Sequence, residues 1–440
     1  MLNENKTDSA GSDEYYLDHL ATINKDRDVV AIQDIYNTSG ALLVRQGARI
    51  DYATARRLTQ HKSSKPVEHQ LQIEGGLTTD GLKQQLQKFL EQHADLATIQ
   101  RSLGADDDLA LLFEKPFSPT LLQKLTVMAL QQPTLLEQAL FGGWLAVLLA
   151  RELSLHPAEI RKAGIAALTR DTGFLHLPPV LIEQGRKFSP QEWRAMQSHT
   201  VVGQIILDDT AGMDPEIGRA VLEHHEGLDG SGYPTGKEGP ALGLLGRVVN
   251  LVDTLCAIRL KNFKDTGRNL RDTQPFLLMN SHAYERNVHD AICSILRKSG
   301  LERTSINPLG TQANLLAQLV AQGNTMRRSL PVVKELSDLH ARTGSTARKL
   351  GKVALQTYTL ITSSGLVNDE IINWLESLLL EPQADEIVFL SEIELLQKEL
   401  RWHHTHLQRA LAAYLNEASP HDPSYGRFKE LAAGLENSEA

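Results

Sequence analysis

The sequence contains few cysteines and no excess of positive charge. Its 440 residues include only two cysteines, Cys256 and Cys293. Two thiols cannot build a disulfide framework or a cysteine-based zinc site within one chain, so the reducing cytoplasm is the expected location. Lys and Arg number 45 against 54 Asp and Glu, which gives a net charge of -9. Nucleic acid is therefore not an expected partner, because phosphate backbones are held mainly by clustered basic side chains.

Long apolar runs and a secretory leader are also lacking. Residues 1–16 are polar and acidic, with neither a basic start nor an apolar stretch of secretory length, and residues 1–25 are predicted to form a disordered tail. The longest apolar helix candidate, Leu145–Ala150, is much shorter than the roughly 20 residues that cross a bilayer. We therefore expect no membrane span.

The length and composition predict a multidomain globular protein. Single cores usually stop growing near roughly 250 to 300 residues, so 440 residues predict two or three domains. Residues 26–77 are predicted to form a small α+β module. Two β-prone runs within residues 29–44 flank the turn-forming group Asn37–Gly40, a helical pattern covers Tyr52–His61, and a further strand follows before Gly75.

Beyond Thr79 the pattern is helical almost throughout. Apolar residues recur every three or four positions, which is typical of amphipathic helices. We predict a helical connector at residues 78–125, a helical domain at 126–300 and a C-terminal helical bundle at 301–440. The expected fold class is therefore mainly α, with the α+β module at the N-terminal side.

The most informative segment reads HHEGLDGSGYPTG, residues 224–236. The adjacent imidazoles of His224 and His225 can supply nitrogen ligands to a transition metal, and the glycines allow the following loop to turn back. The segment resembles the signature of the HD-GYP domain. We call the part with its fixed residues the GYP loop: Asp229, Gly230, Gly232, Tyr233 and Pro234.

Three other segments resemble this family in the expected order, so that the likeness covers roughly Leu135–Leu260. RDTGFLHLPPVLI places Asp171 at the family's His-Asp pair, WRAMQSHTVVGQIIL supplies His199, and LGRVVNLVDTLCAI supplies Asp253. The resemblance implies a helical HD-GYP bundle in which Asp171 bridges the metal ions if the site is active. The implied metal ligands are Asp171, His199, His224, His225 and Asp253.

Three positions depart from the family pattern. Phe141 and Arg170 stand where the resemblance implies histidines of the first metal position, and Phe174 stands where it implies a lysine near the scissile phosphate. Phe cannot coordinate a metal, and Arg has no lone pair free to do so. The remaining ligands imply one divalent transition metal (iron, manganese or zinc), or none if the site is dead. We expect the Arg170 guanidinium to replace the first metal and to pair with Asp171 and Asp253.

Other histidines have simpler interpretations. His176 could be mistaken for a replacement ligand, but a locally satisfied histidine is the favoured interpretation. In the segment WHHTH, His403 and His406 share a helix face. Without a third ligand nearby, a solvated face is favoured over a second metal site.

The resemblance implies cyclic di-GMP signalling and leaves three functions open. The favoured one is a catalytically impaired receptor that binds cyclic di-GMP, or a signalling protein that binds a partner through the GYP loop. The first alternative is a metal-dependent phosphodiesterase that gives pGpG or GMP with the single retained metal. The second is a noncatalytic scaffold. Assembly as a homodimer is also left open.

Overall fold

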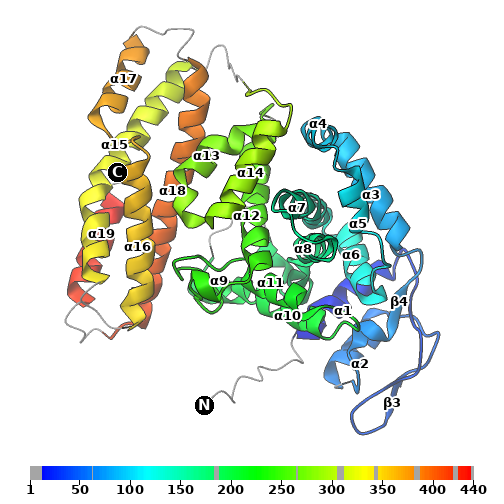
Figure 1. Ribbon diagram of the computed structural model, residues 1–440. Coiled ribbons are helices and arrows are strands. Elements are labelled where there is room, and N and C mark those ends of the chain that lie inside the picture. The colour runs from blue at the N-terminus through cyan, green and yellow to red at the C-terminus, as the bar shows by residue number, and fades with distance from the viewer. Residues whose placement is uncertain are drawn as a thin grey trace. The chain divides into compact units, whose positions relative to one another are not determined.

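The computed structural model describes residues 12–61, 63–182, 188–263, 266–304, 312–340, 345–380, 387–419 and 425–437 (Figure 1). Contacts divide the chain into two compact units. The first comprises Met1–His225 and Leu242–Cys256, and the second comprises Glu226–Ala241 and Ala257–Ala440. The fold is mainly α with a small α+β part near the N-terminal side, as predicted.

The first unit begins with helix α1 (Ser12–Ile23), where a disordered tail was predicted. The prediction is wrong for these residues because one face of α1 is buried: Tyr16, Leu17 and Leu20 are at most 1% exposed. Tertiary packing stabilises a short helix whose isolated sequence would be marginal in water. Residues 1–11 of the predicted tail lie outside the described residues.

In the described residues, four short strands form two antiparallel pairs. Strand β1 (Val29–Ala31) pairs with β4 (Leu71–Ile73), and β2 (Ile35–Tyr36) pairs with β3 (Leu42–Val44). The β2–β3 pair is the predicted hairpin in a shortened form. Its turn is organised by Asn37, whose Oδ1 accepts hydrogen bonds from the backbone N–H groups of Ser39 and Ala41.

The remaining helices of the first unit start with the predicted helix near residue 52 and continue through the HD region. They are α2 (Tyr52–Gln60), α3 (Thr79–Gln92), α4 (Ala94–Leu103), α5 (Asp106–Leu111), α6 (Pro119–Gln131), α7 (Pro133–Glu152), α8 (Pro157–Thr169), α9 (Pro190–Gln197), α10 (His199–Asp208), α11 (Pro215–Glu223) and α12 (Leu244–Ile258), whose last two residues belong to the second unit. Three short 3-10 helices connect them: η1 (Val67–His69), η2 (Thr172–His176) and η3 (Pro179–Ile182).

Helix α7 corrects the expectation that no stretch approaches the length of a membrane span. By length and composition alone it could cross a bilayer, and it is the one such helix among the described residues. However, 78% of its most apolar window is buried inside the protein. At its centre Trp144 is fully buried, and its Nε1 donates to Oε1 of Gln100 at 2.8 Å. Helix α7 packs against α8 and is a core helix, which explains an apolar composition around its whole circumference (Figure 1).

The second unit holds the GYP loop and the C-terminal helices. Its elements are η4 (Gly239–Ala241), the π-helix η5 (Arg259–Phe263), η6 (Leu270–Thr273), α13 (Gln274–Met279), η7 (Ser281–Ala283), α14 (Arg286–Lys298), α15 (Gln312–His340), α16 (Ser345–Ser363), α17 (Asp369–Leu380), α18 (Ile387–Glu417) and α19 (Tyr425–Asn437). This division differs from the predicted boundary at residue 300, because the segment around α13 contacts α18. Arg268 Nη2 lies 2.9 Å from the Ser391 carbonyl oxygen and 3.0 Å from a carboxylate oxygen of Glu394.

Candidate metal centre

Six of the side chains singled out in the sequence come together in the first unit. They are delivered by the α8–η2 junction, the start of α10, the end of α11 and the middle of α12: Arg170, Asp171, His199, His224, His225 and Asp253. Helices from distant parts of the chain commonly assemble a metal site in this way.

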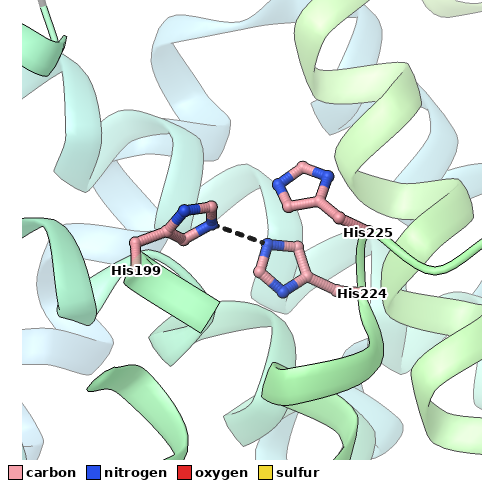
Figure 2. A group of neighbouring side chains, drawn as sticks. All are labelled: His199, His224 and His225. Atoms are coloured by element: carbon pink, nitrogen blue, oxygen red, sulfur yellow. Dashed lines mark hydrogen bonds between the residues drawn. The ribbon is translucent and has the colours of Figure 1, made fainter. Parts of the chain in front are cut away.

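Three imidazole rings form the centre of this group (Figure 2). One ring nitrogen from each of His199, His224 and His225 lies within 4.8 Å of the others. His199 Nε2 is 3.3 Å from His224 Nε2. His199 and His224 are fully buried, whereas the His225 side chain is 26% exposed.

The tautomers of two rings follow from their backbone partners. His199 Nδ1 lies 2.7 Å from the Met196 carbonyl oxygen, and His224 Nδ1 lies 2.6 Å from that of Val221. A carbonyl oxygen only accepts, so each Nδ1 must carry the proton and each Nε2 presents a lone pair. Two lone pairs that face each other across 3.3 Å repel unless a cation lies beside them.

The electrostatic surroundings keep these rings neutral. Burial, reinforced by His224, lowers the pKa of His199 to about 3. Burial also lowers the pKa of His224 and lowers the pKa of His225 well below its usual value. Neutral imidazole is the form that binds metal ions.

The separation between the His199 and His224 nitrogens fits a bound transition metal. Two nitrogens that are each about 2.0 to 2.1 Å from a tetrahedral zinc ion lie roughly 3.4 Å apart, close to the observed separation. The bonds from Nδ1 to backbone carbonyls are the outer contacts that usually orient metal-binding histidines. His199, His224 and His225 can therefore hold a metal ion, and two carboxylates lie beside them: Asp171 Oδ1 is 3.9 Å from His199 Nε2, and Asp253 Oδ2 is 3.8 Å from His225 Nδ1.

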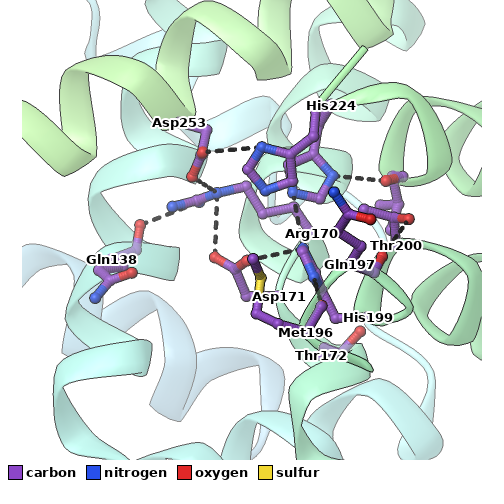
Figure 3. Close-up of polar contacts among 12 residues, drawn as sticks. Gln138, Arg170, Asp171, Thr172, Met196, Gln197, His199, Thr200, His224 and Asp253 are labelled. Atoms are coloured by element: carbon purple, nitrogen blue, oxygen red, sulfur yellow. Dashed lines mark hydrogen bonds and ion pairs between the residues drawn. The ribbon is translucent and has the colours of Figure 1, made fainter. Parts of the chain in front are cut away.

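Arg170 lies between two carboxylates beside this cluster (Figure 3). Its Nε is 2.9 Å from Asp253 Oδ1 and 3.2 Å from Asp171 Oδ2, and its side chain is completely buried. Burial alone would lower the pKa of Arg170, but Asp171 and Asp253 raise it above its ordinary value. The guanidinium is therefore a permanent positive charge within the site, in the pairing that the sequence led us to expect.

The space for this guanidinium is made by helix α7. Arg170 Nη1 donates to the carbonyl oxygens of Ala167 at 2.8 Å and Gln138 at 3.3 Å. A Cβ atom on Gly142 would overlap Nη1 and crowd the Ala167 carbonyl. Gly142 was not identified from the sequence, although a Gly142–Gly143 pair inside an apolar helix is a signal of close approach.

The charges of the site do not balance with Arg170 alone. Burial works to raise the pKa of Asp253, but Arg170 and the neighbouring histidines lower it below its ordinary value. Burial, with Asp253 close by, raises the pKa of Asp171. One guanidinium thus compensates the charge of only one of the two carboxylates. A metal ion at the histidines would neutralise the remaining negative charge.

The two phenylalanines singled out in the sequence, Phe141 and Phe174, have different surroundings. The Phe174 ring, in η2, stacks on the His199 ring with 4.0 Å between centroids and 11° between planes. Phe141 is buried in α7 and packs against Trp144. Neither side chain offers a donor atom to a metal.

The GYP loop belongs to the second unit and is organised by Glu226, whose carboxylate binds the loop and does not take a metal ligand position. Glu226 is 3% exposed, and its carboxylate accepts hydrogen bonds from Thr235 N at 2.7 Å, Thr235 Oγ1 at 2.5 Å, and the backbone N–H groups of Gly236 and Lys237 at 3.1 Å.

The fixed residues of the loop shape its turns. Gly230 has φ of +73°, a conformation that favours glycine, and the Tyr233–Pro234 peptide bond is cis. Asp229 Oδ1 accepts from the Ser231 N–H at 2.9 Å. Gly232 lies in the described part of this loop between those turns.

The other histidines singled out in the sequence, His176, His403 and His406, lie outside the three-imidazole cluster. His176 is buried and pairs with Lys124, as the interpretation of a locally satisfied histidine requires. The solvated face expected for the WHHTH segment is wrong for His403, which is 6% exposed and lies 3.0 Å from Glu399 Oε1. In the part of the chain that the structure describes, no third ligand joins His403 and His406.

Comparisons with known proteins cover the part of the chain that holds these residues. A family model described as an HD domain matches residues 122–288. A cyclic di-GMP phosphodiesterase response regulator of Xanthomonas campestris is 32% identical over 114 residues, which are 26% of this chain and 30% of the relative. A cyclic di-GMP phosphodiesterase of Pseudomonas aeruginosa is 27% identical over 216 residues, 47% of this chain and 52% of the relative.

A third relative carries a different substrate in its name. A 3'3'-cGAMP-specific phosphodiesterase of Vibrio cholerae is 32% identical over 111 residues, 25% of this chain and 24% of the relative. The matched part of this chain thus spans about half or less of the length of these relatives. The matches show that residues 122–288 of this chain contain an HD domain, and the segment HHEGLDGSGYP within them is similar to the signature of the HD-GYP type.

Proposed function

We propose that this chain is a cytoplasmic cyclic di-GMP signalling protein whose HD domain binds the nucleotide with one metal ion and hydrolyses it slowly or not at all. The observation that carries the proposal is the buried guanidinium of Arg170 between Asp171 and Asp253. The choice of cyclic di-GMP as the nucleotide comes from the names of the relatives. The cytoplasmic location is supported by the buried free thiols of Cys256 and Cys293, which are typical of a reducing compartment.

Nucleotide binding is supported by the retained histidines. When bound by His199, His224 and His225, a divalent ion supplies a Lewis acid for a phosphate oxygen. The guanidinium of Arg170 is already engaged by two carboxylates, so it is a poor second partner for phosphate. Recognition of one phosphate by one ion is therefore the arrangement that these residues favour.

Impaired hydrolysis follows from the residues that are committed elsewhere. Phosphodiester cleavage by a two-metal site uses one ion to lower the pKa of the attacking water and both ions to neutralise the phosphate. Here Asp171 and Asp253 already compensate Arg170, and neither Phe141 nor Phe174 can replace a ligand or a positive charge. A second ion would have to compete with a covalently attached cation that cannot diffuse away.

The second candidate is a single-metal phosphodiesterase that gives pGpG or GMP. It is favoured by the three-imidazole cluster, which retains the donor set for one metal. Because one relative is named as specific for 3'3'-cGAMP, the nucleotide to be tested includes this mixed dinucleotide as well as cyclic di-GMP. A noncatalytic scaffold, a partner protein on the GYP loop and a homodimer remain further proposals.

Metal analysis and calorimetry on the full chain test these functions. We expect one iron, manganese or zinc ion per chain, binding of cyclic di-GMP, and little release of pGpG with added Mn²⁺. His224→Ala is the matched control and should lose both metal and nucleotide. Rapid turnover that His225→Ala abolishes would instead support the single-metal phosphodiesterase. If the chain binds neither metal nor nucleotide, the result would support the noncatalytic scaffold.

A further inference from the structure

A buried lysine in helix α6 lies at the centre of a second polar cluster in the first unit. The Lys124 side chain is completely buried, and its Nζ is 2.7 Å from His176 Nε2 and 3.4 Å from Glu68 Oε1. The same Nζ lies over the Tyr16 ring, 3.3 Å from its centroid. These three partners come from η2, η1 and α1, so one ammonium group joins three segments that are distant in the sequence.

His176 is held from two sides in this cluster. Its ring stacks on Tyr16 with 4.8 Å between centroids and 6° between planes. An ammonium group only donates hydrogen bonds, so His176 Nε2 accepts from Lys124 and its Nδ1 carries the proton, 3.8 Å from Asp13 Oδ1. This charge-assisted bond, together with the stacking, leaves the His176 ring little freedom.

The same 3-10 helix that ends at His176 contacts the metal centre. Helix η2 (Thr172–His176) begins directly after Asp171. Within it, Phe174 stacks on the His199 ring, and Gly173 packs so closely on the His199 backbone carbonyl that a Cβ there would overlap it. A displacement of η2 would therefore move both the carboxylate of Asp171 and the ring of His199.

We propose that Lys124 is a positioning residue for the metal centre: by holding His176 it keeps η2 in the place from which Asp171 and Phe174 orient His199. The proposal rests on the proposed function in one respect, the binding of a metal ion by His199, His224 and His225. It also gives the N-terminal α+β module a physical route to that site, because Glu68 of this module is paired with the same ammonium group.

The chemistry of the cluster explains why a lysine is needed. Glu68 is 10% exposed, so its carboxylate depends on a nearby cation, and His176 Nε2 needs a donor. An apolar side chain of similar length would fill the space of Lys124 but satisfy neither group. The segments would then be free to move apart while the apolar packing around them remained.

A cobalt titration of the full-length chain tests the positioning role. Co²⁺ alone is added to metal-free protein, and its visible absorption reports the number and geometry of the ligands. We expect Lys124→Met to weaken Co²⁺ binding at least tenfold and to change the spectrum. His176→Phe, which keeps a ring on Tyr16 but removes the acceptor, should act in the same direction. Lys88→Met, at an exposed position of α3, is the control and should bind as the wild type does.

A second measurement separates positioning from a general loss of structure. Hydrogen–deuterium exchange should increase in residues 171–176 and 196–203 of the Lys124→Met variant while α7 stays protected. If Lys124→Met does not fold, the double variant Lys124→Met with Glu68→Gln, which leaves no buried charge behind, takes its place. A folded variant with wild-type Co²⁺ affinity, spectrum and exchange would overturn the proposal. If the wild type binds no Co²⁺, the proposed metal site fails and the exchange pattern alone decides the positioning role.

Discussion

Gly142 and Arg170 are matched in space: Nη1 of the buried guanidinium occupies the volume in which a Cβ on Gly142 would lie. The two residues belong to α7 and to the end of α8, which pack side by side. Glycine inside a helix costs roughly 1 kcal/mol relative to alanine. At this position the cost is offset by the room that glycine leaves for the only permanent cation among the described residues of the site.

Replacing Gly142 by alanine should therefore destabilise the first unit despite the better helix propensity. Overpacking a core typically destabilises the folded state by about 1 to 3 kcal/mol. The upper part of this range exceeds the roughly 1 kcal/mol that alanine gains over glycine in helix propensity. Gly143→Ala is the matched control, because a Cβ there meets its nearest atoms at 3.4 Å. Urea unfolding followed by tryptophan fluorescence measures the stability. Trp374 and Trp402 are changed to Phe, so that the fluorescence comes only from tryptophans of the first unit. Equal stability of the two variants would contradict the prediction.

Removal of the guanidinium should be more damaging. Arg170→Ala leaves Asp171 and Asp253 facing each other without their cation, and breaking a buried pair costs roughly 3 to 5 kcal/mol. Unfolding in denaturant measures the loss. Arg427→Ala removes an exposed ion pair with Glu335 and serves as the control with a small effect. Excess Mn²⁺ should restore part of the stability of Arg170→Ala but not that of Arg427→Ala, since an ion can enter the space that the guanidinium leaves. An Arg170→Ala variant as stable as the wild type would contradict the pairing.

Removal of metal should lower the stability of the wild-type chain. A ligand that binds only the folded state stabilises it by about 2.7 kcal/mol at a free concentration 100 times its dissociation constant. We therefore expect a lower melting temperature after dialysis against a chelator and its recovery when Mn²⁺ or Zn²⁺ is returned. The His224→Ala variant should melt at the same temperature with and without the ion. A chelator effect that persists in this variant would point to another site.

The Glu68–Lys124 pair should make the first unit sensitive to acid. Burial would raise the pKa of Glu68, but Lys124 and His176 lower it from 4.5 to about 2. A carboxyl group with a depressed pKa in the folded state contributes stability above its unfolded pKa, and this contribution disappears as the pH falls toward 2. The loss should be at most roughly 3 kcal/mol. Glu68→Gln should flatten the stability profile between pH 4.5 and 2, and an unchanged profile would contradict the pairing.

Restoring the substituted positions tests the proposed impairment. If Phe141 and Arg170 stand in for lost ligands, the double variant Phe141→His with Arg170→His should bind a second metal ion. It should then release pGpG from cyclic di-GMP at least tenfold faster than the wild type in Mn²⁺. A variant with two bound ions and no gain in turnover would contradict the proposal that Phe141 and Arg170 impair hydrolysis.

Several features of the site could be predicted because they depend on residue types in local order. The contiguous His224–His225 pair and the signature after it indicated metal ligands, and the neighbours Arg170 and Asp171 indicated an internal ion pair. The helical character of most of the chain was also predicted, from apolar residues that recur every three or four positions. In contrast, helix α1 was not predicted, because it is stabilised by the burial of Tyr16 against the rest of the first unit. No pattern in the neighbouring sequence indicates this contact.

The sequence by itself determined the chemical inventory of this protein: two adjacent imidazoles, a guanidinium next to a carboxylate at Arg170 and Asp171, and a phenylalanine at position 174. These are properties of residue types and of their spacing along the chain. Only the tertiary structure decided which charges meet. It brings Arg170 to a carboxylate 83 residues away and Lys124 to a carboxylate 56 residues away. Such pairs form because a buried charge requires a partner, and which partner it receives depends on how the helices pack.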